Sequence, residues 1–240
     1  MDDHKISDNF QRTEGCKMIS PHHSHPTNGG PLDSNCSRKE RKERKAKMKK
    51  MMMALWCAAM VASSAAMAGT NNVDIVSAAR KQIGVTVGYD PAYRRLAYPN
   101  GDVPRSSGVC TDVVIRALRD ARKVDLQKLV HEDMKTSFSK YPQIWGLKAP
   151  DANIDHRRVP NLQCYFKRKG YALPVSRNAA DYKPGDIVTV MVGGKLPHIM
   201  IVSDRKSAAG VPLAIHNIGA GTKEENSLFT YPMTGHYRIP

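Results

Sequence analysis

Three short apolar runs near the end of the chain constrain its fold most. Residues 186–192, 198–203 and 213–218 are rich in β-branched side chains and are separated by short, turn-forming connections. This spacing predicts an antiparallel meander, and residues 231–239 predict a further strand at its edge. Before residue 170, apolar residues recur at helical spacing instead. Helices first and strands later predict an α+β fold, with N-terminal helices packed on a C-terminal antiparallel sheet.

Four helices are predicted upstream of the strands. Apolar stripes place them over residues 70–83, 110–123, 126–138 and 162–169, and Asp125 and Asn161 are candidate N-caps for the last two. Residues 84–108 and 139–160 contain many turn residues and predict long loops. Arg116 falls on the polar face of the 110–123 helix.

The N-terminal third of the chain predicts export. Residues 48–50 are a short basic start, residues 51–62 are apolar, and Ala66-Met67-Ala68 before Gly69 fits a small-x-small cleavage site. Together residues 48–68 are typical of a signal peptide, so we expect a periplasmic or secreted protein. Residues 1–47 are polar and too long for the charged region of such a peptide, so we interpret them as a disordered leader from an over-extended start. The alternative is an uncleaved anchor, for which 18 residues with two serines are barely enough.

The charge of the chain favours an anionic partner. The formal net charge is +15, and residues 69–240 keep +10, because the first 68 residues hold 12 of the 37 Lys and Arg and 7 of the 22 Asp and Glu. Export argues against nucleic acid. We therefore expect peptidoglycan or another anionic envelope polymer as the partner, and no stable membrane span after signal cleavage. Residues 69–240 form the predicted catalytic or binding domain.

Cleavage after Ala68 leaves two cysteines, Cys110 and Cys164. An oxidising compartment allows a disulfide between them, whereas one catalytic thiol and one spare cysteine fit the same count. The Cys and His spacings show no zinc-type pattern, and we expect neither a metal nor a cofactor.

Cys110 stands where a turn-rich loop meets a predicted helix. Unpaired N–H groups and the positive end of the helix dipole favour a thiolate at this position. Such a setting can lower a cysteine pKa to about 3.5–7.5. A buried, unreactive cysteine fits the position equally well. Asp112, two residues later, is expected to interact with the helix dipole in the first turn.

Two histidines lie in the apolar runs. His198 shares a strand face with Met200 and Val202, and His216 shares one with Ala214, so a charge on either ring would be costly unless it were paired. A thiol at a helix start, a histidine on a strand and a polar residue on the next strand form a thiol-hydrolase triad by role. Cys110 would be the nucleophile, His198 the base and His216 the residue that orients His198.

The remaining polar candidates rank lower. The backbone N–H of Cys110 and its neighbours could hold an oxyanion. Asn217 points to the face opposite His216, so it is a weaker third residue. Asp186 is interpreted as an acceptor in a turn. The other histidines of the domain are expected at the surface: His131, His156 and His236.

Four segments resemble the NlpC/P60 cell-wall hydrolases, within the papain-like thiol peptidases. They are residues 108–114 (Gly-Val-Cys-Thr-Asp-Val-Val), 183–188 (Lys-Pro-Gly-Asp-Ile-Val), 198–202 (His-Ile-Met-Ile-Val) and 215–217 (Ile-His-Asn). More closely, nearly all of residues 69–240 resemble the bacterial family called domain of unknown function DUF1287. The resemblance implies a papain-like fold and metal-independent cleavage of an amide bond in peptidoglycan stem peptides.

The chain departs from the NlpC/P60 pattern in two places. The usual Asp-Cys-Ser-Gly around the nucleophile is Val109-Cys110-Thr111-Asp112 here. The upstream tyrosine of that family has two candidates, Tyr98 first and Tyr89 second. Both departures bear on which substrate is bound more than on the assignment of Cys110 as the nucleophile.

Three functions remain open at this stage. The leading hypothesis is an exported cysteine amidase or endopeptidase with a Cys-His-His triad. The second is a non-catalytic module that binds the cell envelope and has kept the fold. The third is an amidase or acyl-transfer enzyme of the same fold that acts on another substrate. The pH dependence of thiol alkylation at Cys110 distinguishes an activated thiol from an inert one.

Overall fold

A computed structural model describes residues 42–50 and 72–240. Residues 42–50 form a helix with exposed side chains, and they belong to a different unit from residues 67–240. The predicted leader, residues 1–47, and the predicted signal peptide, residues 48–68, therefore lie mostly outside the described residues. None of the helices in the described ranges combines the length and the apolar character needed to cross a bilayer.

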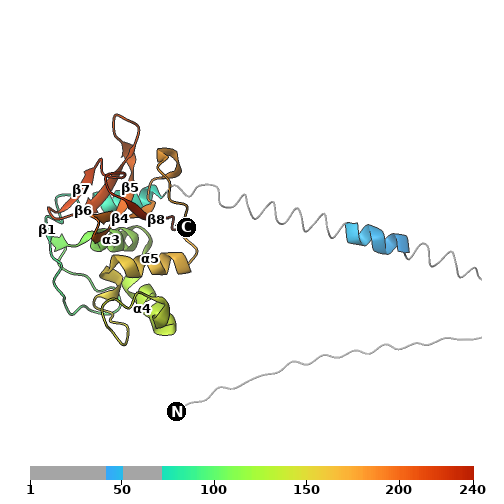
Figure 1. The fold of residues 1–240 in the computed structure, drawn as a ribbon, viewed down its shortest axis with the longest axis horizontal. Helices are drawn as coiled ribbons and strands as arrows, with labels where there is room; N and C mark the ends of the chain where they lie inside the picture. The colour runs from blue at the N-terminus through green and yellow to red at the C-terminus, as the bar shows by residue number, and fades with distance from the viewer. Residues whose placement is uncertain (1–41, 51–71) are drawn as a thin grey trace, which may run out of the picture. The chain divides into compact units, whose positions relative to one another are not determined.

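A six-stranded antiparallel sheet forms the C-terminal part of the domain (Figure 1). Its order is β3-β8-β4-β5-β6-β7. The strands are β3 (Ala172–Leu173), β4 (Ile187–Val192), β5 (Leu196–Lys206), β6 (Pro212–Asn217), β7 (Thr222–Glu225) and β8 (Met233–Tyr237).

The predicted meander is present as β4, β5 and β6, which pair antiparallel in chain order. The predicted edge position of the last strand is wrong, because β8 lies between β3 and β4. Strands β3 and β7 were not predicted. Two residues cannot show an alternation, and the polar Thr-Lys-Glu-Glu of β7 gives no apolar signal.

Within residues 72–240, four α-helices precede the main sheet, namely α2 (Val73–Arg80), α3 (Cys110–Arg122), α4 (Leu126–Ser137) and α5 (Val159–Arg168). The predicted starts of α3 and α4 are confirmed, and the Asp125 carboxylate caps α4 by accepting from the Lys128 N–H at 3.2 Å. Helix α5 begins three residues earlier than predicted. Pro160 is tolerated there because the first turn of a helix needs no N–H donor at that position.

The sheet separates two apolar layers. Alternate residues on β4, β5 and β6 point to opposite faces. One face packs against α3 and α5 (Figure 1), and its members include Ile187, Ile199, Ile201 and Ile215. The other face includes Val188, Met200, Val202 and Ala214. The α+β arrangement of helices packed on an antiparallel sheet is therefore observed.

Arg116 is completely buried in α3, although the helical pattern placed it on the polar face. Its guanidinium forms an ion pair with Asp102 at 3.0 Å and donates to the carbonyl oxygens of Val103 and Ser107, also at 3.0 Å. The residue 84–108 segment folds over this face of the helix, which is why the polar face is not solvent-exposed. Arg116 thus fixes the loop that leads to Cys110.

Candidate active site

The loop before Cys110 is tied to the sheet by Asn217. Its amide Nδ2 donates to the carbonyl oxygens of Gly88 and Gly108, both at 3.0 Å. These glycines belong to a short parallel pair of strands, β1 (Gly88–Tyr89) and β2 (Ser107–Gly108). A Cβ atom on Gly108 would lie 2.9 Å from Asp112 Oδ2, so a larger residue does not fit. Asn217 points away from His216, as predicted, and holds this loop.

Asp112 caps the first turn of α3. Its Oδ2 accepts from the N–H of Val109 at 2.7 Å. The same carboxylate forms two hydrogen bonds with Arg157, from Nε at 3.0 Å and from Nη2 at 2.9 Å. The first-turn position was predicted, but the arginine partner was not. Arg157 ends the 3₁₀ turn η2 (Asp155–Arg157), so this ion pair joins that turn to the start of α3.

The Cys110 thiol is buried, with a residue exposure of 6%. Burial raises the pKa of the thiol to about 11, and the nearby Ile199 backbone N–H opposes that shift with a smaller effect. The shift is therefore opposite to the lowering expected at a helix start. The reason is that the desolvation cost of a buried thiolate exceeds the stabilisation that the nearby N–H groups give to it.

No disulfide links the two cysteines of the domain. Cys110 and Cys164 are both free thiols, and Cys164 donates to the carbonyl oxygen of Lys140 at 3.3 Å. Cys164 is only partly buried on α5, which agrees with its position off the apolar stripe. The sequence left open either a disulfide or two free thiols, and the structure has two free thiols.

The structure brings the two predicted histidines together. His198 Nε2 and His216 Nδ1 are joined by a hydrogen bond of 2.8 Å, and both rings are buried. The second nitrogen of His216, Nε2, is 3.0 Å from Ser227 Oγ and 3.5 Å from Glu225 Oε2. Burial, and then the neighbouring His216, lower the pKa of His198 to about 3. Burial also lowers the pKa of His216, against the opposing effect of Glu225.

The thiol and His198 both lie near the first residues of β5, where β5 is not paired with β6. The pairing of β5 with β6 begins at Ile201, so the segment from His198 to Met200 has no partner on β6. The Cys110 thiol lies near Ile199 there, in the apolar layer on the helix-covered face. The strand pattern assigns His198 and His216 to the opposite face, with Met200 and Ala214.

The predicted triad is therefore only partly assembled in this structure. Within residues 72–240, no hydrogen bond joins Cys110 Sγ to His198. Because His198 Nε2 is committed to His216, Nδ1 is the ring nitrogen left for another partner. At neutral pH the thiol and both imidazoles are uncharged, given the directions of their pKa shifts.

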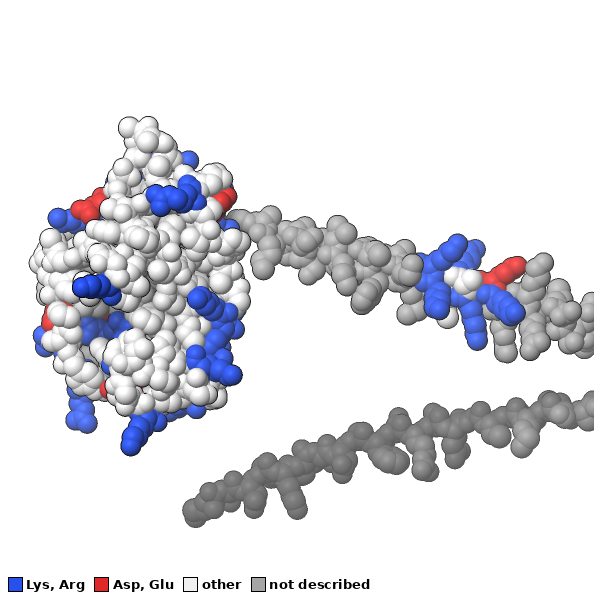
Figure 2. All heavy atoms as spheres, viewed as in Figure 1, with Lys and Arg blue, Asp and Glu red and all other residues white. Residues whose placement is uncertain are grey.

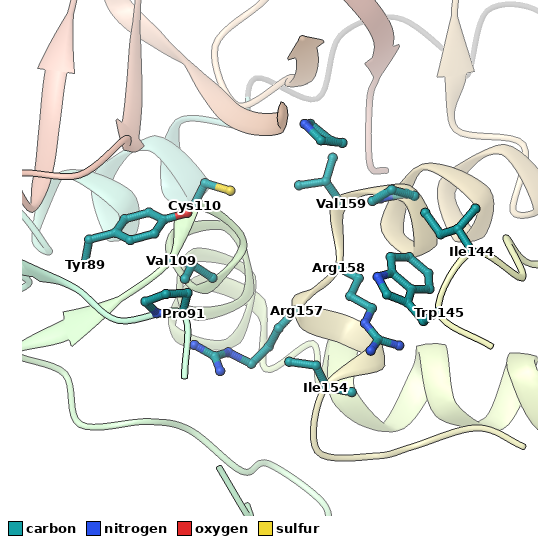
Figure 3. A pocket seen from close by; sticks show the side chains of 12 residues that line it. Tyr89, Pro91, Val109, Cys110, Ile144, Trp145, Ile154, Arg157, Arg158 and Val159 are labelled. Atoms are coloured by element: carbon teal, nitrogen blue, oxygen red, sulfur yellow. The ribbon is translucent and has the colours of Figure 1, made fainter. Parts of the chain in front are cut away.

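A pocket of about 320 Å³ opens beside Cys110 (Figure 3). Tyr89 and Cys110 lie on one side of it, and Trp145 and Arg158 lie on the other. The guanidinium of Arg158 stacks 4.1 Å from the centre of the Trp145 ring and donates to Asp155 at 3.2 Å. The wall is otherwise mostly apolar, as in many small-molecule sites.

The tyrosine at the pocket is Tyr89, the second candidate, and not Tyr98, the first. Tyr89 lines the pocket beside Cys110 (Figure 3). Burial, followed by the charges of Cys110 and Asp112, raises the pKa of its hydroxyl to about 12. Tyr98 instead packs edge-on against His131 of α4, with ring centroids 5.2 Å apart. The placement of Tyr98 at the site was therefore wrong.

Two histidines expected at the surface are buried. His236 lies inside the sheet on β8, and its Nε2 is 2.7 Å from Asp186 Oδ2. Asp186 accepts from the Lys183 N–H, as expected for a turn, and also pairs with Arg238. His156, in η2, is covered from the side of α4, and burial lowers its pKa to about 3. Neither environment could be read from the local sequence.

The pocket residues that sequence reasoning missed come mainly from the irregular 139–160 segment. Trp145, Arg157 and Arg158 have no periodic neighbours, so nothing in the sequence indicates their direction. Ser227 and Glu225 were missed because β7 was missed. In the described residues, no cluster of three His, Cys, Asp or Glu side chains has the arrangement of a metal site.

Comparison with known proteins identifies the family. The family described as "Domain of unknown function (DUF1287)" matches residues 76–239, which include Cys110, His198 and His216. The uncharacterized protein YijF of Escherichia coli (strain K12) is 59% identical over 167 residues, which cover 70% of this chain and 81% of that protein. With a match over more than half of its length, this chain belongs to the DUF1287 family.

Proposed function

We propose that this protein is an exported thiol hydrolase with a papain-like, NlpC/P60-type domain, which cleaves an amide bond in peptidoglycan stem peptides. One observation carries the proposal. A thiol at a helix start lines a pocket and lies near Ile199, the neighbour of His198, whose ring is hydrogen-bonded to His216. These residue types and roles are those of a cysteine hydrolase.

In the first step, Cys110 Sγ attacks the carbonyl carbon of the scissile amide. Because the resting thiol and imidazole are both uncharged, the thiol proton passes to His198 Nδ1 as the S–C bond forms. This transfer requires the two side chains to close the distance between them when substrate binds. The N–H groups of Cys110 and Thr111 in the first turn of α3 stabilise the negative oxygen.

In the second step, the tetrahedral intermediate collapses. The C–N bond breaks, and the leaving amine takes the proton from His198, which leaves a thioester on Cys110. Water then attacks the thioester carbonyl and gives a proton to His198, and the returning thiolate regains that proton as the acid product leaves. His216 keeps the His198 ring in place through both proton transfers.

The charge of the domain suits the proposed envelope polymer. Lys and Arg side chains are distributed over the visible face of the domain, with few acidic groups among them (Figure 2). Distributed positive charge favours binding to a polyanion without a single anchoring patch. The apolar pocket with Arg158 at its side accommodates a peptide group within that polymer.

The experiment is digestion of purified muropeptides, followed by mass spectrometry. Wild type is expected to release products whose masses identify one cleaved amide bond. Cys110→Ala and His198→Ala are each expected to remove this activity while thermal unfolding stays cooperative. Cys164→Ser is the matched control, because it removes the other thiol of the domain, which lies on α5 away from the pocket. Equal product formation by Cys110→Ala would overturn the proposal.

A second candidate function is a non-catalytic module that binds the cell envelope. The raised pKa of the Cys110 thiol and the missing hydrogen bond between that thiol and His198 within residues 72–240 favour it. A binding module would sediment with purified sacculi in a saturable, salt-sensitive manner and would release no peptide. Transfer of the acyl group to an amine, in place of water, would be recognised by the mass of the product.

A further inference from the structure

The histidine pair continues beyond His216 into β7 and the turn after it. His216 Nε2 is 3.0 Å from the hydroxyl of Ser227, which is buried. The same nitrogen is 3.5 Å from the carboxylate oxygen Oε2 of Glu225, the last residue of β7. A hydroxyl and a carboxylate therefore both face Nε2 of His216, the nitrogen of that ring that does not contact His198.

Proton counting links that nitrogen to the far end of the pair. A neutral imidazole carries one N–H and one bare nitrogen. If His216 carries its proton on Nε2, its bare Nδ1 must accept from His198 Nε2, and His198 Nδ1 is then bare. If His216 carries its proton on Nδ1, His198 must accept at Nε2, and its Nδ1 then carries a proton. Only the first arrangement leaves His198 able to take a proton from a thiol.

Glu225 distinguishes the two arrangements. The Ser227 hydroxyl can donate or accept, so it fits either one. A carboxylate only accepts, and its negative charge attracts an N–H and repels the lone pair of a bare nitrogen. His216 is buried, whereas the Glu225 side chain is 43% exposed, so water partly screens this attraction. The carboxylate therefore favours a proton on His216 Nε2.

We propose that Glu225 is a positioning residue, which holds a proton on His216 Nε2 beside the Ser227 hydroxyl and so leaves His198 Nδ1 bare and available as a base. The proton arrangement is a property of the resting protein. Its use in catalysis rests on the proposed function above. Neither residue contacts the pocket, so their effect passes through His216.

Nitrogen-15 NMR of the histidine rings in the full-length protein at neutral pH tests the proton arrangement directly. Wild type is expected to show His198 protonated on Nε2 and His216 also protonated on Nε2. Glu225→Gln places an amide that can donate to His216 Nε2, and it is expected to move a measurable fraction of His198 to the Nδ1–H form. Glu132→Gln, an exposed glutamate on α4, is the matched control and is expected to change nothing.

The hydroxyl is tested by a pair of variants. Ser227→Ala removes the short-range acceptor, and Ser227→Thr keeps a hydroxyl at the same place. Because the hydroxyl fits either arrangement, both variants are expected to keep His198 protonated on Nε2 while Glu225 is present. A shift of the His198 tautomer in the alanine variant would assign the control to Ser227 and overturn the role of Glu225. If Ser227→Ala fails to unfold cooperatively, the Glu225→Gln spectra decide alone, because Glu225 is partly exposed and its replacement leaves no cavity.

The activity readout is a change in kcat without a change in KM. A base that is competent in only one-tenth of the molecules lowers kcat about tenfold. A wild-type spectrum with His198 protonated on Nδ1 would overturn the inference, and so would an unchanged tautomer in Glu225→Gln. The expected spectra together with a wild type that cleaves no muropeptide would instead overturn the proposed function and leave the proton arrangement established.

Discussion

Arg157 and Asp112 form a buried ion pair through two hydrogen bonds of 3.0 and 2.9 Å, with side-chain exposures of 2% and 4%. Arg157 also donates to the carbonyl oxygens of Asp90 and Ala92, which belong to the loop that directly follows Tyr89. The pair thus connects three segments around the thiol: the first turn of α3, the η2 turn and the loop after β1. It explains how a largely irregular part of the chain forms a defined pocket wall.

Arg157→Met is expected to lower the free energy of unfolding by about 3–5 kcal/mol, because it leaves the Asp112 carboxylate buried without its charged partner. Urea denaturation followed by circular dichroism measures the loss. Arg94→Met is the control, since Arg94 pairs with Asp90 at the surface and such pairs are worth at most about 1 kcal/mol. Losses of similar size in the two variants would contradict a structural role for the buried pair.

The Cys110 thiol is expected to react slowly with iodoacetamide at pH 7–8. Only the thiolate is alkylated, and burial raises the pKa of this thiol to about 11. The labelling rate should therefore rise about tenfold for each pH unit up to that value. Peptide mass spectrometry assigns the label to Cys110 or to Cys164, whose thiol also has a raised pKa from burial and serves as the internal comparison.

Fast labelling of Cys110 below pH 8 would contradict this expectation. It would mean that the resting protein already holds a thiolate beside a protonated His198, an arrangement with the side chains closer than they lie here. A preformed ion pair of that kind would strengthen the proposed hydrolase over the binding module, so the measurement also separates the two candidate functions.

Local patterns were enough to predict much of this fold. The helix starts at Cys110 and Leu126 follow from turn residues, a cap and apolar spacing, and the alternation in β5 and β6 places His198 and His216 on one face. That alternation is a property of neighbouring residues on a strand, so it is readable without knowledge of the rest of the molecule. The hydrogen bond between the two rings follows from it once the strands are adjacent.

Long-range contacts could not be predicted in this way. Arg116 belongs to the polar face of its helix by spacing, yet a distant loop covers it and supplies carbonyl acceptors. Ser227 reaches His216 only because a polar strand without an apolar pattern pairs beside β6. The direction of the Cys110 pKa shift was also missed, because the helix start is visible in the sequence and the burial around it is not.

Tyr89→Phe is expected to lower kcat/KM for muropeptide cleavage by about 100- to 1,000-fold, because the Tyr89 hydroxyl at the pocket beside Cys110 can donate to the developing oxyanion. Tyr98→Phe is the matched control and is expected to leave the rate unchanged, because Tyr98 packs on His131 away from the pocket. Steady-state kinetics of both variants give the comparison. A larger loss of kcat/KM in Tyr98→Phe than in Tyr89→Phe would identify Tyr98 as the functional tyrosine and contradict the role of Tyr89.

His156 is expected to make the domain less stable as pH falls from about 7 to 5. Burial, and then the nearby charges of Arg157 and Arg119, lower its pKa to about 3 from an ordinary value of 6.5. Between these two values the unfolded chain binds a proton that the folded protein excludes, so stability is present above pH 6.5 and is lost as pH falls towards 3. Over the interval from pH 7 to 5 this linkage amounts to about 2 kcal/mol.

His156→Phe removes the titrating ring from a site where its Nδ1 has no hydrogen-bond partner among the described residues. The difference in unfolding free energy between pH 7 and pH 5, measured by urea denaturation, should shrink by about 2 kcal/mol relative to wild type. The carboxylates with lowered pKa values, such as Asp186, lose their contribution only below about pH 4, so they do not mask the effect in this interval. An unchanged pH dependence in His156→Phe would mean that this imidazole is accessible to protons in the folded protein, and that η2 is less tightly packed against α4 than its buried ring indicates.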